Sequence, residues 1–319
     1  MKAVVTGVAG FVGSHLARKL LTDGHQVIGI DALTDYYDVD IKKRNLADLP
    51  NGDFSFCFGN INDVDLSAVL SGADWIFHQA GQPGVRKSWG SDFSIYVREN
   101  IAATQKLLEA AKACSTLKRL VYASSSSIYG NAERYPTSET ARPQPVSPYG
   151  VTKLAAEHLC TLYAQNFGLP TVSLRYFTVY GPSQRPDMAF SRFVRAALFD
   201  EVITVYGTGD QVRDFTYVDD IVRANIVVAA NDVPAGSVFN VAGGSNLSVN
   251  EALATLGRIA ARPLRIDYRD AVAGDVYRTG ADTTRIEEAI GWKASVPFEK
   301  GLAKHFDWCV ETLGALELV

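Results

Sequence analysis

Short apolar runs alternate with amphipathic segments along the first half of the chain. The apolar runs predict five strands, at residues 3–5, 26–30, 54–58, 75–78 and 119–123. Between them, apolar residues recur at helical spacing, as at Val12, Leu16 and Leu20, and again through 102–114. An alternation of strand and helix predicts parallel strands that are joined by crossover helices.

The second half of the chain loses this regular alternation. Residues 131–148 contain four prolines and predict a long loop, which we expect to cover the candidate ligand site described below. A helix at 149–167 and a strand at 171–177 follow this loop. Beyond Tyr180 the pattern becomes mixed and shorter, which indicates a smaller lobe. The apolar run at 238–241 is expected to return to the main sheet.

These patterns predict an α/β fold with a doubly wound parallel sheet of the Rossmann type and a smaller, mixed C-terminal lobe. The predicted boundaries are 1–178 for the sheet domain, with 213–245 returning to it, and 179–319 for a substrate-binding lobe. A (β/α)8 barrel is disfavoured because the later chain does not continue the alternation.

Composition places the chain among ordinary globular proteins. Of its 319 residues, 47% are hydrophobic and 21% are charged, and the formal net charge is −4. These values argue against disorder and give nucleic-acid binding no support. The four cysteines and five histidines are dispersed, so we expect neither a disulfide framework nor a metal site. We also expect no signal peptide and no membrane span, and therefore a soluble, cytoplasmic protein.

A glycine-rich turn joins the first predicted strand to the first predicted helix. It contains Gly7, Gly10 and Gly13, with Phe11 and Val12 between the last two glycines. Such a turn lets backbone N–H groups approach a pyrophosphate, which also faces the positive end of the helix dipole. The sequence therefore predicts a dinucleotide site at this turn.

Asp31 ends the second predicted strand, 18 residues after Gly13. A carboxylate at this position accepts hydrogen bonds from the adenosine-ribose hydroxyls and repels a 2′-phosphate, which predicts NAD rather than NADP. The third and fourth predicted strands also end at the ligand crevice. Their candidate cofactor contacts are Asn60, Ile61, Gln79 and Ala80.

Tyr149 and Lys153 are four residues apart and share one face of a predicted helix. A tyrosine phenol has a pKa of about 10, and a neighbouring ammonium favours the phenolate. Tyr149 could then take a proton from a substrate hydroxyl while hydride leaves the same carbon for a nicotinamide. A serine from the run at 124–127 would hold the substrate oxygen.

Five motifs occur in an order that resembles the extended short-chain dehydrogenases/reductases, which include nucleotide-sugar epimerases and dehydratases. They are TGVAGFVG, Asp31, SSSSIYG, YGVTK and LRYFTVYGP. The resemblance covers nearly the whole chain. It implies a Rossmann domain that holds NAD, a C-terminal lobe that binds a nucleotide sugar, and a homodimer. It also implies that Ser125 is the catalytic hydroxyl and that Asn100 and Tyr176 contact the cofactor.

Local features narrow the choice among the members of this family. Ser126 and Ser127 stand where related dehydratases carry acids for elimination, so a dehydratase is disfavoured. The segments DYYD at 35–38, GVR at 84–86 and GPSQRPDMAF at 181–190 are similar to those of UDP-glucuronate 4-epimerases. The sequence therefore indicates a UDP-sugar substrate that carries a uronic acid.

The resemblance also nominates substrate contacts. Neutral hydroxyls of Ser126, Ser127 and Thr178 would bind a sugar carboxylate, where a glutamate would repel it. Arginine forks suit pyrophosphate, and we expect Arg213 and Arg278 to bind the UDP diphosphate. The other candidate substrate contacts are Arg86, Arg185, Met188 and Asp275.

The expected reaction inverts the sugar C4 through a 4-keto intermediate and regenerates NAD. Two other activities of the same family stay open, a UDP-glucose 4-epimerase and a UDP-glucuronate decarboxylase. A non-catalytic NAD-binding regulator is a remote alternative. Such a regulator has no need for Ser125, Tyr149 and Lys153 together.

Overall fold

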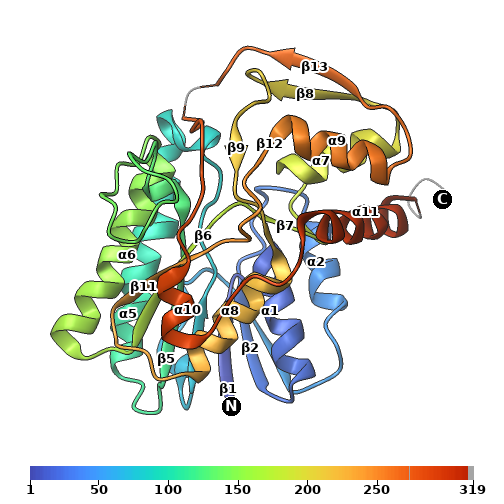
Figure 1. Ribbon diagram of the computed structural model, residues 1–319. Coiled ribbons are helices and arrows are strands. Elements are labelled where there is room, and N and C mark those ends of the chain that lie inside the picture. Colours follow the sequence, from blue (N-terminus) through green and yellow to red (C-terminus); the bar gives the residue numbers. More distant parts are fainter. Residues whose placement is uncertain (273, 315–319) are drawn as a thin grey trace.

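Seven parallel strands form the main sheet. In the computed structural model, which describes residues 1–272 and 274–314, their order is β11-β6-β5-β4-β1-β2-β3 (Figure 1). The strands are β1 (Lys2–Thr6), β2 (Gln26–Asp31), β3 (Phe54–Phe58), β4 (Trp75–His78), β5 (Arg119–Ser125), β6 (Thr171–Tyr176) and β11 (Ser237–Val241). All five strands that were predicted in the first half are therefore present.

Strand β11 pairs with β6 in parallel, with Val238 opposite Ser173, so the chain returns to the main sheet after it has built much of the smaller lobe. This return was predicted from the apolar run at 238–241. The predicted α/β fold with a doubly wound parallel sheet is confirmed.

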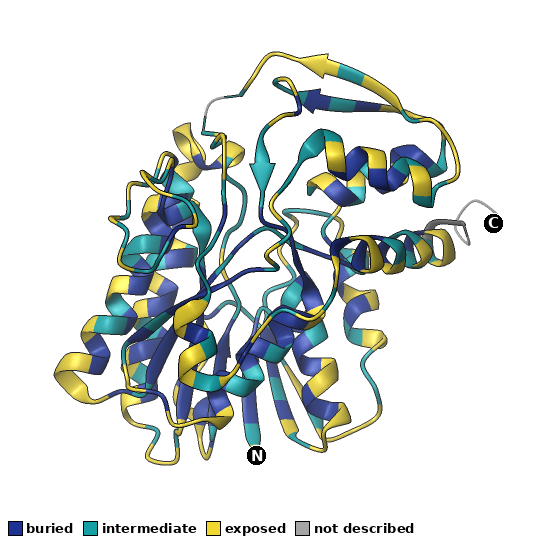
Figure 2. Cartoon of the chain, in the orientation of Figure 1, coloured by how far each residue is buried: buried dark blue, intermediate teal, exposed yellow. Residues whose placement is uncertain are grey.

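Helices cover both faces of this sheet because the side chains of each strand alternate between two apolar clusters. Ala3 and Val5 pack with α1 (Phe11–Thr22) and α8 (Val218–Ala230), whereas Val4 packs on the opposite face. That opposite face is covered by α3 (Leu66–Leu70), α5 (Ala103–Lys112) and α6 (Pro148–Phe167). Figure 2 shows the resulting layers, with buried strands inside and exposed outer helix faces.

Local signals in the sequence fix both ends of α6. Ser147 is the N-cap and accepts a hydrogen bond from the Gly150 amide at 3.1 Å, while Pro148 occupies the first turn. Gly168 ends the helix with a φ of 67°, a conformation that suits glycine. The helix predicted at 149–167 is present and begins one residue earlier.

A six-residue π-helical segment, η3 (Val97–Ala102), precedes α5 and was not predicted. It contains Asn100, which is buried. A π-helix shifts the angular position of its side chains relative to a regular α-helix, and the apolar periodicity at 102–114 carried no sign of it.

The smaller lobe is built around aromatic side chains. Tyr180, Phe190, Phe215 and Phe298 pack with ring centroids 5.0–6.4 Å apart. Its larger elements are α7 (Ala189–Leu198), β8 (Val202–Tyr206), α9 (Val249–Ile259), β13 (Arg265–Arg269) and α11 (Phe298–Gly314). Strands β8 and β13 pair in parallel at the top of Figure 1.

Short elements complete the chain. They are α2 (Val39–Ala47), η1 (Arg86–Ser88), η2 (Gly90–Asp92), α4 (Phe93–Tyr96), η4 (Ser126–Ile128), β7 (Val179–Tyr180), β9 (Val212–Arg213), β10 (Thr216–Tyr217), β12 (Leu247–Ser248) and α10 (Thr284–Ile290). Across the described residues, no helix combines the length and the apolar character that a membrane crossing requires.

His305 on α11 makes the stability of this fold depend on pH. The side chain is fully buried, and neither ring nitrogen has a hydrogen-bond partner among the described residues. Burial lowers the pKa of His305 from 6.5 to about 3. The unfolded state takes up the proton first, so burial of the neutral His305 imidazole costs no stability above pH 6.5. The free energy of unfolding then falls as the pH falls from 6.5 towards 3.

Between pH 6.5 and pH 5, we expect the free energy of unfolding to fall by about 2 kcal/mol less in His305→Phe than in the wild type. Urea unfolding at the two pH values measures this difference. His158→Gln, on the exposed surface of α6, is the control and should leave the difference as it is. Equal pH dependence in the wild type and in His305→Phe would contradict the assignment.

Candidate active site

One cleft of ≈ 510 Å³ lies at the carboxyl ends of the main-sheet strands. Parallel strands place these ends along one edge, where ligand crevices of doubly wound sheets form. Most of the predicted site residues line it. They are Gly7, Gly10, Phe11, Val12, Gly13, Asp31, Asn60, Ile61, Gln79, Ala80, Asn100, Ser125, Ser126, Ser127, Tyr149, Lys153, Tyr176, Thr178, Arg185 and Met188.

The glycine turn passes very close to neighbouring backbone. Gly7 has a φ of 69°, and a Cβ there would lie 2.8 Å from the Ala80 amide nitrogen. A Cβ at Gly13 would overlap the carbonyl oxygen of Gly7. Gly10 is the N-cap of α1 and supplies no side-chain acceptor, so the first amides of this helix stay available at the cleft. The turn therefore fits a pyrophosphate group.

Asp31 is held in place at the end of β2. Its carboxylate accepts hydrogen bonds from the amides of Ala9, at 3.0 Å, and Leu33, at 2.8 Å. Each carboxylate oxygen accepts more than one hydrogen bond, so both can also receive a ribose hydroxyl. The position and chemistry of Asp31 fit an NAD ribose.

Two predicted cofactor contacts also brace the cleft wall. Asn100 accepts a hydrogen bond from the Gln82 amide at 2.6 Å and donates to the Gln82 carbonyl and to the Thr152 hydroxyl. Tyr176 shares hydrogen bonds with Gln79 and Asn225. Both amide hydrogens of Asn100 are therefore engaged within the protein.

Tyr149 and Lys153 lie on successive turns of α6 and both line the cleft. Burial raises the pKa of Tyr149, whereas a hydrogen bond with Ser125 and the charge of Arg185 lower it. Burial lowers the pKa of Lys153 to about 8. The sequence pattern pointed to Lys153 as the group that favours the phenolate, whereas in the structure Ser125 and Arg185 are the groups that lower the pKa of Tyr149.

The serine run turns from β5 into η4 at the cleft. The Ser125 hydroxyl oxygen accepts a hydrogen bond from the Ser127 amide at 3.1 Å, which fixes the turn. Arg185 reaches the same cleft and pairs with Asp187 through two contacts of 3.0 Å. The cleft thus joins the serine hydroxyls, the Tyr149 phenol and the cations of Lys153 and Arg185.

Four predicted substrate residues lie outside this lining and gather in a second cluster. Arg86 and Asp275 pair at 2.8 Å, and Arg213 donates to the Val276 carbonyl at 2.6 Å. The guanidinium of Arg278 lies 5.0 Å from the Tyr135 ring centroid. A bridge between Val212 and Arg278 connects these segments. The structure thus places this second cluster on the smaller lobe and its facing loops.

Residues beyond the predicted set also line the cleft. Tyr36, Tyr37 and Lys42 follow β2, and the Lys42 ammonium donates to the Thr34 carbonyl at 2.6 Å and lies 4.6 Å from the Tyr37 ring centroid. The DYYD resemblance was the available signal for this segment. Glu99 lines the cleft as well and accepts a hydrogen bond from the side-chain amide of Asn60 at 2.8 Å. This contact has no local sequence signature.

Metal ligation finds no geometric support in the described part of the chain. No group of three or more histidine, cysteine, aspartate or glutamate residues within it could hold a metal ion. All four cysteines are free.

Comparisons with known proteins agree with this geometry. An uncharacterized UDP-glucose epimerase of Bacillus subtilis, YtcB, is 42% identical over 304 residues, which is 95% of this chain and 96% of its own length. The UDP-glucuronate 4-epimerase of Thermodesulfobacterium geofontis is 35% identical over 323 residues, 99% of this chain and 98% of its own length.

A solved structure gives the same result. The crystal structure of UDP-glucuronic acid 4-epimerase from Bacillus cereus, in complex with UDP-glucuronic acid and NAD, has a TM-score of 0.94 and 40% identity, covering 98% of this chain and 99% of that chain. The resemblance to extended short-chain dehydrogenases/reductases is confirmed. Because the model of the NAD dependent epimerase/dehydratase family matches residues 3–242, the chain belongs to that family.

Proposed function

We propose that this chain is an NAD-dependent UDP-glucuronate 4-epimerase, which interconverts UDP-glucuronate and UDP-galacturonate through a 4-keto intermediate. The observation that carries the proposal is the meeting of Ser125, Tyr149 and Lys153 in a cleft that also contains the glycine turn. The similarity to a structure that holds UDP-glucuronic acid and NAD supports the substrate class.

The glycine turn and Asp31 would hold NAD, which supplies a reversible hydride acceptor when bound. Ser125 would orient the C4 hydroxyl of the sugar, and Tyr149 would take its proton. The charges of Lys153 and Arg185 favour the phenolate that this step requires. In the return half of the reaction, Tyr149 gives the proton back to the C4 oxygen.

Inversion requires the 4-keto sugar to present its other face. The intermediate is a β-keto acid, which loses carbon dioxide when the bond to its carboxylate lies perpendicular to the carbonyl plane. Ser126, Ser127 and Thr178 line the cleft and would hold the carboxylate away from that orientation. Neutral hydroxyls suit this task because they bind a carboxylate without transferring a proton to it.

The nucleotide half of the substrate would bind the smaller lobe. We place the UDP diphosphate at Arg213 and Arg278 and the uridine ribose at Asp275, with Arg86 beside them. In this arrangement the domain at 1–178, to which the segment 213–245 returns, binds NAD, and the lobe at 179–319 binds the nucleotide sugar. The clustering of these four side chains supports the assignment.

A homodimer is also part of the proposal. Apolar side chains remain exposed on α4, η3 and α6, which form one side of the main-sheet domain. They are Phe93, Ile95, Val97, Val151, Leu162 and Phe167. A second copy of the chain that packs against this side would remove them from water.

A UDP-glucose 4-epimerase is the second candidate, because the YtcB relative carries that description. UDP-glucuronate and UDP-glucose are each incubated with the purified protein without added NAD, and the products are identified by NMR. We expect UDP-galacturonate from the first and no comparable conversion of the second. Preferential conversion of UDP-glucose would favour the second candidate, and a pentose product would indicate a decarboxylase.

Tyr149→Phe removes the proton acceptor and should lower kcat for epimerisation by about 10²-fold to 10⁴-fold. Tyr268→Phe, on the half-exposed strand β13, is the matched control and should retain activity. Steady-state kinetics with UDP-glucuronate measures the difference, and circular dichroism checks that both variants fold. Full activity in Tyr149→Phe would refute the proposed chemistry.

Thr178→Val removes one hydroxyl from the carboxylate clamp and keeps the side-chain shape. A hydrogen bond to a charged group contributes about 1.5–3 kcal/mol, so we expect the ratio of pentose to hexuronate product to rise roughly tenfold or more. The readouts are the ratio of pentose to hexuronate product and the release of carbon dioxide. Thr255→Val on α9 is the control; an unchanged product ratio in Thr178→Val, with full epimerisation, would disprove the clamp.

A further inference from the structure

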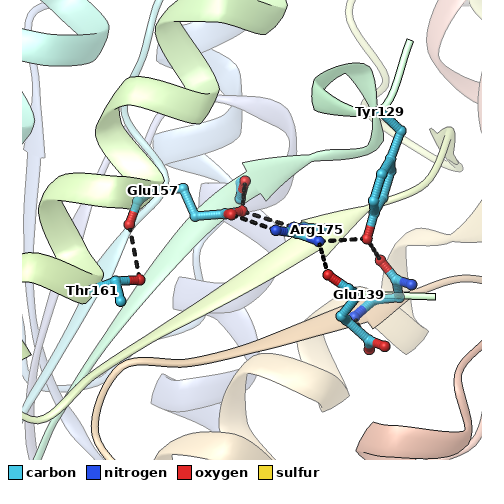
Figure 3. A network of polar contacts seen from close by, with 7 residues as sticks. Tyr129, Glu139, Glu157, Thr161 and Arg175 are labelled. Atoms are coloured by element: carbon cyan, nitrogen blue, oxygen red, sulfur yellow. Dashed lines mark hydrogen bonds and ion pairs between the residues drawn. The ribbon is translucent and has the colours of Figure 1, made fainter. Parts of the chain in front are cut away.

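A buried carboxylate lies one helical turn beyond Lys153. Glu157 on α6 is 2% exposed and pairs with Arg175 of β6, with distances of 2.6 Å from Oε1 to Nη2 and 3.0 Å from Oε2 to Nε (Figure 3). Its Oε2 also accepts a hydrogen bond from the Ser124 hydroxyl at 2.6 Å. Glu157 therefore connects α6 to the neighbouring strands β5 and β6 behind the cleft wall.

Arg175 has no freedom to leave this pair. The side chain is 5% exposed, and its Nη1 donates to the Tyr129 hydroxyl at 2.6 Å and to the Glu139 carbonyl at 3.1 Å. Figure 3 shows Arg175 between Glu157 and Tyr129. The Tyr129 hydroxyl in turn donates to Asn240 on β11 at 2.7 Å. This network engages both oxygens of the Glu157 carboxylate and fixes it in position.

Glu157 is linked to two of the proposed catalytic groups, to Lys153 through their shared helix and to Ser125 through Ser124. Tyr149, Lys153 and Glu157 follow one another at intervals of four residues and share one face of α6. Ser124 precedes Ser125 at the end of β5, so its hydrogen bond to Glu157 anchors the strand end that presents Ser125.

Glu157 is also the carboxylate whose charge acts on the Lys153 ammonium. The Lys153 ammonium lies 4.4 Å from the Tyr122 ring centroid, and His78 stays neutral because burial lowers its pKa to about 3. Burial raises the pKa of the Cys160 thiol, which stays protonated. Burial lowers the pKa of Lys153, whereas Cys160 and Glu157 raise it. Because the Cys160 thiol is neutral, Glu157 supplies the opposing charge at neutral pH. The groups around Lys153 are thus Tyr149, Glu157 and Cys160 on α6, His78 on β4, Tyr122 on β5 and Asn100 on η3.

We propose that Glu157 is a positioning residue of the reaction: its carboxylate keeps Lys153 protonated at neutral pH and, through Ser124, holds Ser125 in place. The inference rests on the proposed function for the roles of Ser125, Tyr149 and Lys153. Glu157 itself does not line the cleft.

The first test follows the charge of Lys153 without any substrate. The protein is labelled with [ε-13C]lysine, and the Lys153 signal is identified by its loss in Lys153→Met. We expect Glu157→Gln to lower the NMR titration midpoint of Lys153 by about one pH unit. Glu139→Gln removes a carboxylate on the far side of Arg175 and should leave the midpoint unchanged. An unchanged midpoint in Glu157→Gln, or an equal shift in Glu139→Gln, would overturn the proposal.

The second test separates positioning from a merely structural role. In Glu157→Gln we expect kcat for UDP-glucuronate to fall roughly 10-fold to 100-fold, KM to stay nearly constant, and the alkaline limb of the kcat–pH profile to move down with the Lys153 midpoint. Ser124→Ala should lower kcat without moving that limb. A limb that stays in place in Glu157→Gln would contradict the inference.

Loss of one partner leaves a buried charge uncompensated, so Glu157→Gln itself could fail to fold. The double variant Glu157→Gln/Arg175→Gln removes both charges, and we expect the Lys153 midpoint to shift in the same direction. Because the titration needs no sugar, it tests Glu157 even if the wild-type protein does not convert UDP-glucuronate. Wild-type turnover, in contrast, tests the proposed function alone.

Discussion

The burial of charge behind the cleft is the constraint on which the rest of the site depends. In the proposed reaction Lys153 must be an ammonium to favour a phenolate at Tyr149, yet burial disfavours the charged form of Lys153. A carboxylate one turn away opposes that cost, and this carboxylate in turn requires Arg175. Arg175 is satisfied by Tyr129 and a backbone carbonyl. The buried charges of Glu157 and Arg175 compensate each other, and the neighbouring oxygens satisfy the remaining donors of Arg175.

This series also joins parts of the chain that are far apart in sequence. It begins on α6, crosses β6, and ends at Asn240 on β11, which accepts a hydrogen bond from Tyr129 and donates to the carbonyls of Thr137 and Asp282. The proline-containing loop between η4 and α6 is therefore tied to the strand that returns from the smaller lobe. The same contacts that stabilise the sheet edge position the wall of the cleft.

The two lobes contribute different chemistry. The main sheet ends in fixed backbone and buried side chains: the glycine turn, Asp31, and the Tyr149–Lys153 face of α6. The smaller lobe and the loops opposite it contribute arginines that are paired with carboxylates or carbonyls, as in Arg86 with Asp275 and Arg185 with Asp187. A substrate with negative charges can replace such partners, whereas a neutral sugar offers less compensation for them.

The sequence by itself determined the features that depend on neighbours along the chain. The periodicity predicted the strands and helices of the sheet domain, and the turn with Gly7, Gly10 and Gly13 has a local steric cause. Tyr149 and Lys153 share a helix face because of their spacing alone. Tertiary structure decided what depends on contacts across the fold. The π-helical segment at Asn100, the contact of Glu99 with Asn60, and the Glu157–Arg175 pair have no local signature, because packing and the compensation of buried charge join residues from separate elements.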